Sequence, residues 1–175
     1  MASGDTLCVF DALDGIAGDA DYATLDAFLT ASADEPDSIV PVLDFDPGAT
    51  EEYMYFRGLM PAHYDGGGVT VTLRWSSDAT TGNVIWGVAF KSITADADDL
   101  DSKAFAAPNE SAADATASAA GETTDTPITF TDGADMDSVA AGEMFWIEVH
   151  RSSADASDTL DSNDAELHQI VIAET

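Results

Sequence analysis

The chain has 175 residues, 45% of them hydrophobic, which is enough for one domain with a core and excludes a disordered acidic tail. Its five Lys and Arg residues stand against 34 Asp and Glu residues, giving a formal net charge of −29. Nucleic acids and anionic membranes are bound through basic patches, so the composition predicts neither as a partner. The basic residues are scattered singly along the chain: Arg57, Arg74, Lys91, Lys103 and Arg151.

The first predicted element is a strand at residues 6–10. It contains Cys8, the only cysteine, so no internal disulfide is possible and we expect a small core residue. The N-terminus lacks the basic and apolar regions of a signal peptide, and no apolar run has the length of a membrane span, so we expect a soluble protein made in the cytoplasm. Residues 15–37 are rich in Asp and Ala and predict a solvated acidic loop with a short helix at 22–30.

Two stretches in the middle of the chain place large apolar residues at every second position, at 68–77 and 83–93. Alternation with a period of two is typical of strands that bury one face. The segment between them is rich in turn-forming residues. We therefore predict an antiparallel hairpin at the centre of the fold, with Trp75 and Trp86 on its buried face.

The remaining strand candidates are short and are separated by Gly, Asp and Pro. They lie at 39–45, 51–60, 102–106, 127–131, 144–152 and 166–173, with a weaker one within 112–119 and a short helical segment at 137–141. This pattern predicts an all-β fold, an antiparallel β-sandwich of jelly-roll type with about eight to ten short strands. We expect a single domain over residues 1–175, in which 1–37 form an N-terminal strand plus acidic loop and 38–175 form the sandwich core.

Catalytic motifs are missing from the sequence, which has no Gly-x-Ser-x-Gly, His-Glu-x-x-His, Cys-x-x-Cys or phosphate-binding loop. We therefore predict no enzyme and no cofactor. The three histidines, His63, His150 and His168, are far apart in the sequence and are interpreted as structural. A weak calcium candidate without the spacing of an EF-hand is formed by Asp96, Asp98, Asp99 and Asp101, and no metal site is predicted.

Aromatic residues occupy alternating strand positions, where they form either a platform for sugars or the core of the sandwich. We favour the core for this set: Tyr53, Tyr55, Phe56, Trp75, Trp86, Phe90, Phe145 and Trp146. However, segments 51–60 and 144–152 carry bulky apolar residues on both faces, whereas a sandwich buries one face of each sheet. The second face predicts a subunit contact, with Tyr53, Tyr55, Phe145 and Ile147 as interface candidates.

Several runs together resemble a family of small β-sandwich structural proteins, head-decoration or fibre-like, of tailed viruses and proviruses. They are MASGDTL (1–7), YATLD (22–26), PVLDFD (41–46), FRGLMP (56–61), YDGGGVTVTLRW (64–75), TGNVIWGVAF (81–90), FTDGADMDSVAAGE (130–143) and DAEL (164–167). The likeness covers nearly the whole chain in the same order. It implies a virion protein with no catalytic residues. The acidic composition, typical of halophiles, implies a virus of a haloarchaeon.

The resemblance favours a capsid decoration or cement protein that stabilises the virus head. We expect a homotrimer seated on the major capsid protein at the capsid exterior of the virion, after assembly in the host cytoplasm. The alternative is a receptor- or glycan-binding module of a tail fibre, baseplate or capsid spike. A third hypothesis, an enzyme such as a depolymerase, is supported only by the abundance of carboxylates.

Overall fold

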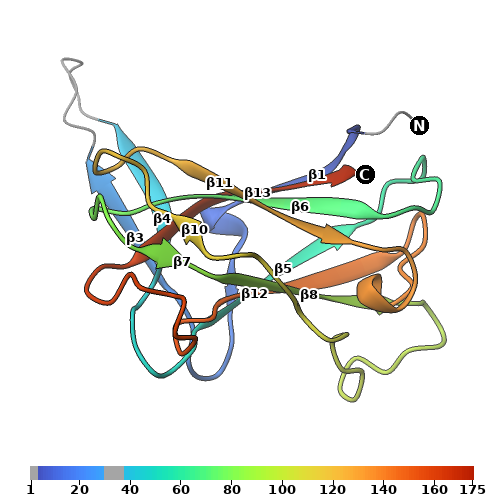
Figure 1. Ribbon diagram of the computed structural model, residues 1–175. Coiled ribbons are helices and arrows are strands. Elements are labelled where there is room, and N and C mark those ends of the chain that lie inside the picture. The colour runs from blue at the N-terminus through green and yellow to red at the C-terminus, as the bar shows by residue number, and fades with distance from the viewer. Residues whose placement is uncertain (1–3, 30–37) are drawn as a thin grey trace.

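Two antiparallel sheets pack face to face in the computed structural model, which describes residues 4–29 and 38–175 (Figure 1). The six-stranded sheet contains β1 (Thr6–Asp11), β3 (Thr24–Leu29), β4 (Ile39–Phe45), β6 (Val69–Ser76), β11 (Thr124–Phe130) and β13 (Ala165–Glu174). The five-stranded sheet contains β2 (Ile16–Ala17), β5 (Tyr53–Leu59), β8 (Trp86–Ile93), β9 (Asn109–Glu110) and β12 (Met144–Arg151).

A third, two-stranded ribbon joins β7 (Asn83–Val84) to β10 (Asp114–Ala115). The described residues thus form the predicted antiparallel β-sandwich of jelly-roll type, with 13 strands rather than about eight to ten, because several strands are only two residues long. Two 3-10 turns, η1 (Ala12–Asp14) and η2 (Ala134–Met136), complete the elements. Within the described ranges, no helix is long and apolar enough to cross a membrane.

The core lies between the sheets and is filled by the apolar positions of the alternating strands. Trp75 of β6 and Trp86 of β8 are fully buried, as predicted, and their rings meet nearly edge to face with centroids 6.1 Å apart. The predicted hairpin between their strands is wrong. β6 pairs with β11 and β13, whereas β8 pairs with β12 and β9, so the two tryptophans face each other from opposite sheets.

Residues 15–29 of the acidic N-terminal segment form more regular structure than their composition predicts. They contribute β2 and β3, and the helix predicted at 22–30 is wrong because residues 24–29 pair with β4 from Thr24↔Asp44 to Leu29↔Ile39. Pairing with an adjacent strand satisfies the backbone of β3 regardless of its weak intrinsic preference for strand. The part of the predicted loop at 30–37 lies outside the described residues.

Two smaller expectations also fail. The strand predicted at 102–106 is irregular, and the helical segment predicted at 137–141 is a turn. Asp137 and Ser138 have φ values of 50° and 58°, a left-handed conformation that ends the 3-10 turn η2. The weak strand candidate within 112–119 contains β10.

A buried ion pair ties three parts of the sandwich together. Arg151, at the end of β12, is only 1% exposed and binds Asp158 through Nε at 3.0 Å and Nη2 at 2.8 Å. Its guanidinium also donates to the backbone carbonyls of Phe45, Leu160 and Asn163. A buried charge is tolerated when it is paired and its remaining donors are satisfied, and both conditions hold here.

The outer face of the six-stranded sheet brings carboxylates together. Burial, together with the nearby charges of Glu166, Asp164, Asp26 and Asp46, raises the pKa of Asp44 to about 7. An unfolded aspartate has a pKa of 3.8. Between this pH and about 7, Asp44 is therefore protonated in the folded chain and ionised in the unfolded chain. The contribution of Asp44 to stability is therefore lost as the pH rises through 7.

We expect the melting temperature to rise as the pH is lowered from about 8 to about 6.5 at constant ionic strength, and Asp44→Asn to remove much of that rise. The pH range of this test ends at about 6.5 because burial lowers the pKa values of His150 and His168. At lower pH the unfolded chain binds protons at these histidines more readily than the folded chain does, so their effect on the melting temperature opposes that of Asp44. Asp161→Asn, at an exposed carboxylate, is the matched control. An equal pH dependence in wild type and Asp44→Asn would contradict the assignment.

Candidate functional site

The outward face of β12 carries the candidate site. Phe145 and Ile147 point into the core and are fully buried, whereas Trp146 and Glu148 point outward. Interface roles for Phe145 and Ile147 are therefore wrong. A glycine on β5 favours the burial of Phe145 rather than Trp146. Gly58 lies opposite Phe145 and leaves room for its ring, since a Cβ at Gly58 would lie 2.5 Å from Phe145 Cζ.

The register of β5, β12 and β8 arranges the outer face into three cross-strand rows. They are Arg57–Trp146–Lys91, Tyr55–Glu148–Ala89 and Tyr53–His150–Gly87. The interface candidates Tyr53 and Tyr55 thus lie on this face, partly exposed. Their place at a contact between subunits remains a prediction.

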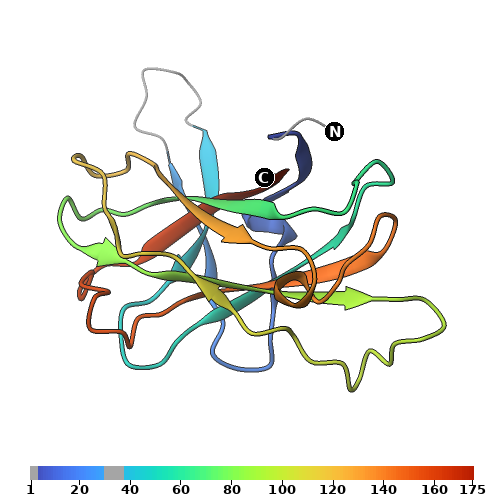
Figure 2. The ribbon, with the colours of Figure 1, turned by 45° about the vertical axis from the view of Figure 1, so that its right-hand side comes forward.

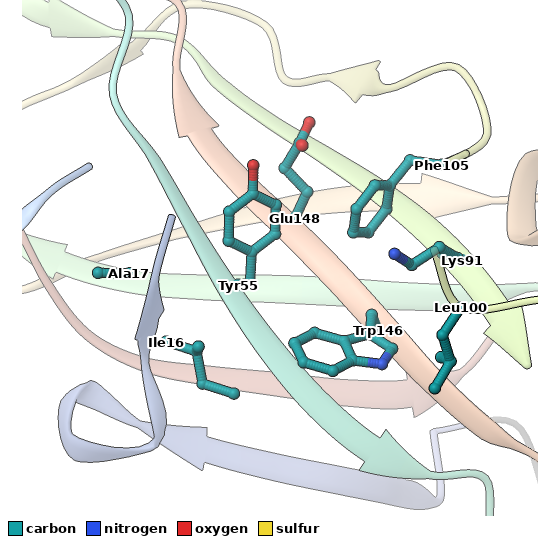
Figure 3. Close-up of a pocket in the computed structure, with 8 residues that line it drawn as sticks. All are labelled: Ile16, Ala17, Tyr55, Lys91, Leu100, Phe105, Trp146 and Glu148. Carbon is teal, nitrogen blue, oxygen red and sulfur yellow. The ribbon is translucent and has the colours of Figure 1, made fainter. Parts of the chain in front are cut away.

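A pocket of about 500 Å³ opens over the first two rows (Figure 3). β5, β8 and β12 supply its floor with Tyr55, Lys91, Trp146 and Glu148, and β2 forms one wall. The segment between β8 and β9 extends beyond the sheet (Figure 2) and supplies Leu100 and Phe105. The remaining lining residues are Ile16 and Ala17.

Three aromatic side chains and one ammonium group give the pocket its character. The rings of Tyr55 and Phe105 lie 5.7 Å apart between centroids at an angle of 31°. Lys91 Nζ lies 4.5 Å from the centroid of Phe105 and 5.7 Å from that of Trp146. These distances are within the range of cation–π attraction, so the ammonium group is held between two rings (Figure 3).

Glu148 is the acidic group of the pocket. Burial raises the pKa of its carboxyl, and a hydrogen bond from the Tyr55 hydroxyl and the charge of Lys91 act in the opposite direction. Among the described residues, Tyr55 is therefore its hydrogen-bond donor and Lys91 its nearby cation. A carboxylate has lone pairs for about four hydrogen bonds, so it can accept further bonds from hydroxyl groups of a ligand.

The other candidates from the sequence do not gather at one place. His150 lies on the outer face of the five-stranded sheet beside Tyr53, with ring centroids 5.1 Å apart, while His168 lies on the other sheet within 2.8 Å of Ser76 Oγ. In the acidic turn, Asp98 accepts a hydrogen bond from Lys103 at 2.9 Å. Among the residues that the structure describes, no group of three His, Cys, Asp or Glu side chains could hold a metal ion, so Asp96, Asp98, Asp99 and Asp101 form no such group.

No family model matches the chain, and no curated protein matches it either. Among solved structures, a family 35 carbohydrate-binding module from Clostridium thermocellum is 12% identical, with a TM-score of 0.50 over 96% of this chain and 98% of that one. This chain resembles a carbohydrate-binding module in fold. At this identity the likeness concerns the fold alone.

Two further structures align over nearly the whole chain at lower similarity. The C-terminal family 6 carbohydrate-binding module of a marine laminarinase from Zobellia galactanivorans is 8% identical, with a TM-score of 0.44 over 95% of this chain and 98% of that one. The enzymatically active domain of tailspike protein 4 from bacteriophage CBA120 is 14% identical, with a TM-score of 0.37 over 97% of this chain and 19% of that one. Neither score is high enough to carry an argument.

Proposed function

We propose that this protein is a non-catalytic glycan-binding module whose ligand occupies the aromatic pocket on the five-stranded sheet. The observation that carries the proposal is the grouping of Tyr55, Phe105 and Trp146 with Glu148 and Lys91 around one open pocket. Small-molecule sites are concave, mostly apolar and aromatic, with a few convergent polar groups. This combination suits a sugar, because one face of a pyranose ring presents C–H groups and its edge presents hydroxyls.

The individual contacts follow from that chemistry. A sugar ring laid on Trp146 would cover apolar area that is otherwise partly exposed. Glu148 would accept hydrogen bonds from ring hydroxyls, and Lys91 would donate to hydroxyl or ring oxygens. Aromatic side chains from three separate segments line the pocket of about 500 Å³, so we expect a short oligosaccharide rather than a monosaccharide as the ligand.

Trp146→Ala is expected to weaken oligosaccharide binding by about tenfold or more, equivalent to about 1.4 kcal/mol or more, without unfolding the protein. Titration calorimetry against a panel of neutral and acidic oligosaccharides measures the effect, and melting temperatures check the fold. Trp146→Phe, which keeps a smaller ring, should retain more affinity than Trp146→Ala. Val9→Ala, on the other sheet, is the control and should bind normally. Binding that is insensitive to Trp146→Ala would place the sugar elsewhere.

A place on a virus capsid is the second candidate function, carried by the sequence resemblance. Exposed apolar side chains suit attachment to another protein surface, and Val9, Leu13 and Leu59 are each more than half exposed. Cys8 Sγ, next to Val9, lies 3.6 Å from the Leu59 carbonyl. The two functions are compatible, because a glycan-binding domain can be displayed on a particle.

The copy number of this chain relative to the major capsid protein in purified virions tests the second candidate. A decoration protein is expected at on the order of hundreds of copies per particle, because it repeats with the shell symmetry. A handful of copies would indicate a tail or vertex component, and absence from virions would remove the capsid proposal.

A further inference from the structure

The distribution of the five cationic side chains is uneven. Three are neutralised by close carboxylates: Arg74 by Asp125 at 2.7 Å, Lys103 by Asp98 at 2.9 Å and Asp137 at 3.2 Å, and Arg151 by Asp158 at 2.8 Å. The remaining two, Arg57 and Lys91, form no ion pair within 4.0 Å with any residue that the structure describes. In a chain with 34 acidic residues, two cations without a carboxylate at ion-pair distance in the described part of the chain are a distinct local feature.

Both of these cations flank the same indole ring. Arg57 on β5 and Lys91 on β8 are the cross-strand neighbours of Trp146 on β12. Arg57 Cζ lies 6.0 Å from the centroid of Trp146, and Lys91 Nζ lies 5.7 Å from it. The row therefore presents an aromatic side chain with a cationic residue on the strand at each side. Trp146 and Lys91 line the pocket, and Arg57 lies next to Trp146 outside the lining.

The next row has the opposite character. Glu148 lies between Tyr55 and Ala89, accepts a hydrogen bond from Tyr55 and feels the charge of Lys91. Along the floor of the pocket, the row of Trp146 and its cationic neighbours is thus followed by a row in which Glu148 accepts hydrogen bonds. A ligand matched to this floor has an anionic group at one end and hydroxyl groups at the other.

We propose that the pocket selects anionic sugars, with the carboxylate or sulfate of the sugar held between Arg57 and Lys91 and its ring on Trp146. This inference rests on the proposed glycan-binding function. Guanidinium groups bind carboxylates and sulfates through two parallel hydrogen bonds, and an ammonium adds a point charge. The ring hydroxyls then lie toward Glu148 and Tyr55.

The net charge of −29 does not oppose such a ligand in strong salt. At about 1 M ionic strength the screening length is about 3 Å, so the repulsion between the whole protein and an anion is lost. Hydrogen-bonded contacts at shorter range survive this screening. Selectivity for an anion under these conditions depends on the two cations that touch it rather than on the overall field.

The test compares ligands that differ only in charge. Calorimetry in about 1 M KCl uses short oligomers of galacturonate, glucuronate and mannuronate as free acids and as methyl esters, sulfated and desulfated galactan oligomers, and neutral xylan and laminarin oligomers. We expect at least one anionic oligomer to bind about tenfold more tightly than its uncharged counterpart. Whether the uronate or the sulfate pair shows the preference identifies the anionic group.

Variants then locate the preference. Arg57→Gln, at an exposed position, and Lys91→Met should each bring the ratio of the two affinities toward one, whereas Arg74→Gln on the other sheet should leave it unchanged. Equal affinity for charged and uncharged ligands, or a preference that survives both the Arg57 and the Lys91 variant, would overturn the inference while leaving glycan binding in place. If no oligomer of either kind binds, the proposed function itself is wrong.

Discussion

Trp86→Ala is expected to lower the free energy of unfolding by about 3–5 kcal/mol, the range for emptying a large buried aromatic site. Trp86 is fully buried and contacts aromatic rings from the other sheet. The centroid of Phe45 lies 5.0 Å from its own, at an interplanar angle of 85°, and that of Trp75 lies 6.1 Å away. Removing the indole therefore leaves a cavity between the sheets that rigid neighbouring strands cannot close.

No hydrogen bond is lost with the indole, because Trp86 Nε1 has no partner among the described residues. The expected cost is thus one of packing alone. Chemical denaturation at a fixed high salt concentration measures it. Trp146→Ala is the matched control, since it removes the same side chain from the outer face of the same sheet and should cost much less. Similar costs for the two variants would contradict the placement of Trp86 in the core.

Alternation in the sequence predicted burial well and strand pairing poorly. Trp75 and Trp86 are buried as predicted, because alternate positions of a strand share one face. The pattern carries no information on the neighbouring strand, however, and β6 and β8 lie in different sheets. Strand order in a jelly roll is set by contacts between distant segments, such as β6 with β13, which local sequence does not encode.

The candidate site could be predicted only in part, for a related reason. Bulky residues on both faces of segment 144–152 indicated that large side chains would also lie on the outer face of the sheet, but not which of the two alternating sets points outward. That choice depends on Gly58 of β5, which makes room for Phe145 in the core and so turns Trp146 outward. The assignment of Tyr53, Tyr55 and Trp146 to the core was therefore wrong, since all three lie on the outer face and are partly exposed. The role of Tyr53 and Tyr55 as interface residues stays a prediction.

Two further groups of the site had no recognisable signal. Phe105 comes from the irregular segment after β8, which alternation had assigned to a strand. Lys91 reads as an ordinary polar residue of an alternating strand. Its significance appears only when the register places it beside Trp146 and opposite Arg57. A cluster that spans three strands requires the sheet before it can be seen.

Folding is expected to depend on salt, with the melting temperature rising by about 10 °C or more between about 0.01 M and about 1 M KCl. The reason is the net charge of −29, which repels itself more strongly in the compact state than in the unfolded chain. The repulsion has a specific location on the six-stranded sheet. The charges of Glu166, Asp164, Asp26 and Asp46 all raise the pKa of Asp44, so these groups oppose each other's ionisation.

The screening length falls from about 30 Å at 0.01 M to about 3 Å at 1 M, and most of the increase in stability should therefore occur below about 0.2 M. Thermal unfolding followed by circular dichroism measures the curve. Sucrose is the control, because it strengthens burial by exclusion from the surface without screening charge. Asp44→Asn should also melt at a higher temperature than wild type at low salt, with the difference shrinking as salt is added. If the repulsion among the acidic side chains strongly destabilises the fold, screening by salt must raise the melting temperature. An equal melting temperature at both salt concentrations would therefore contradict this explanation.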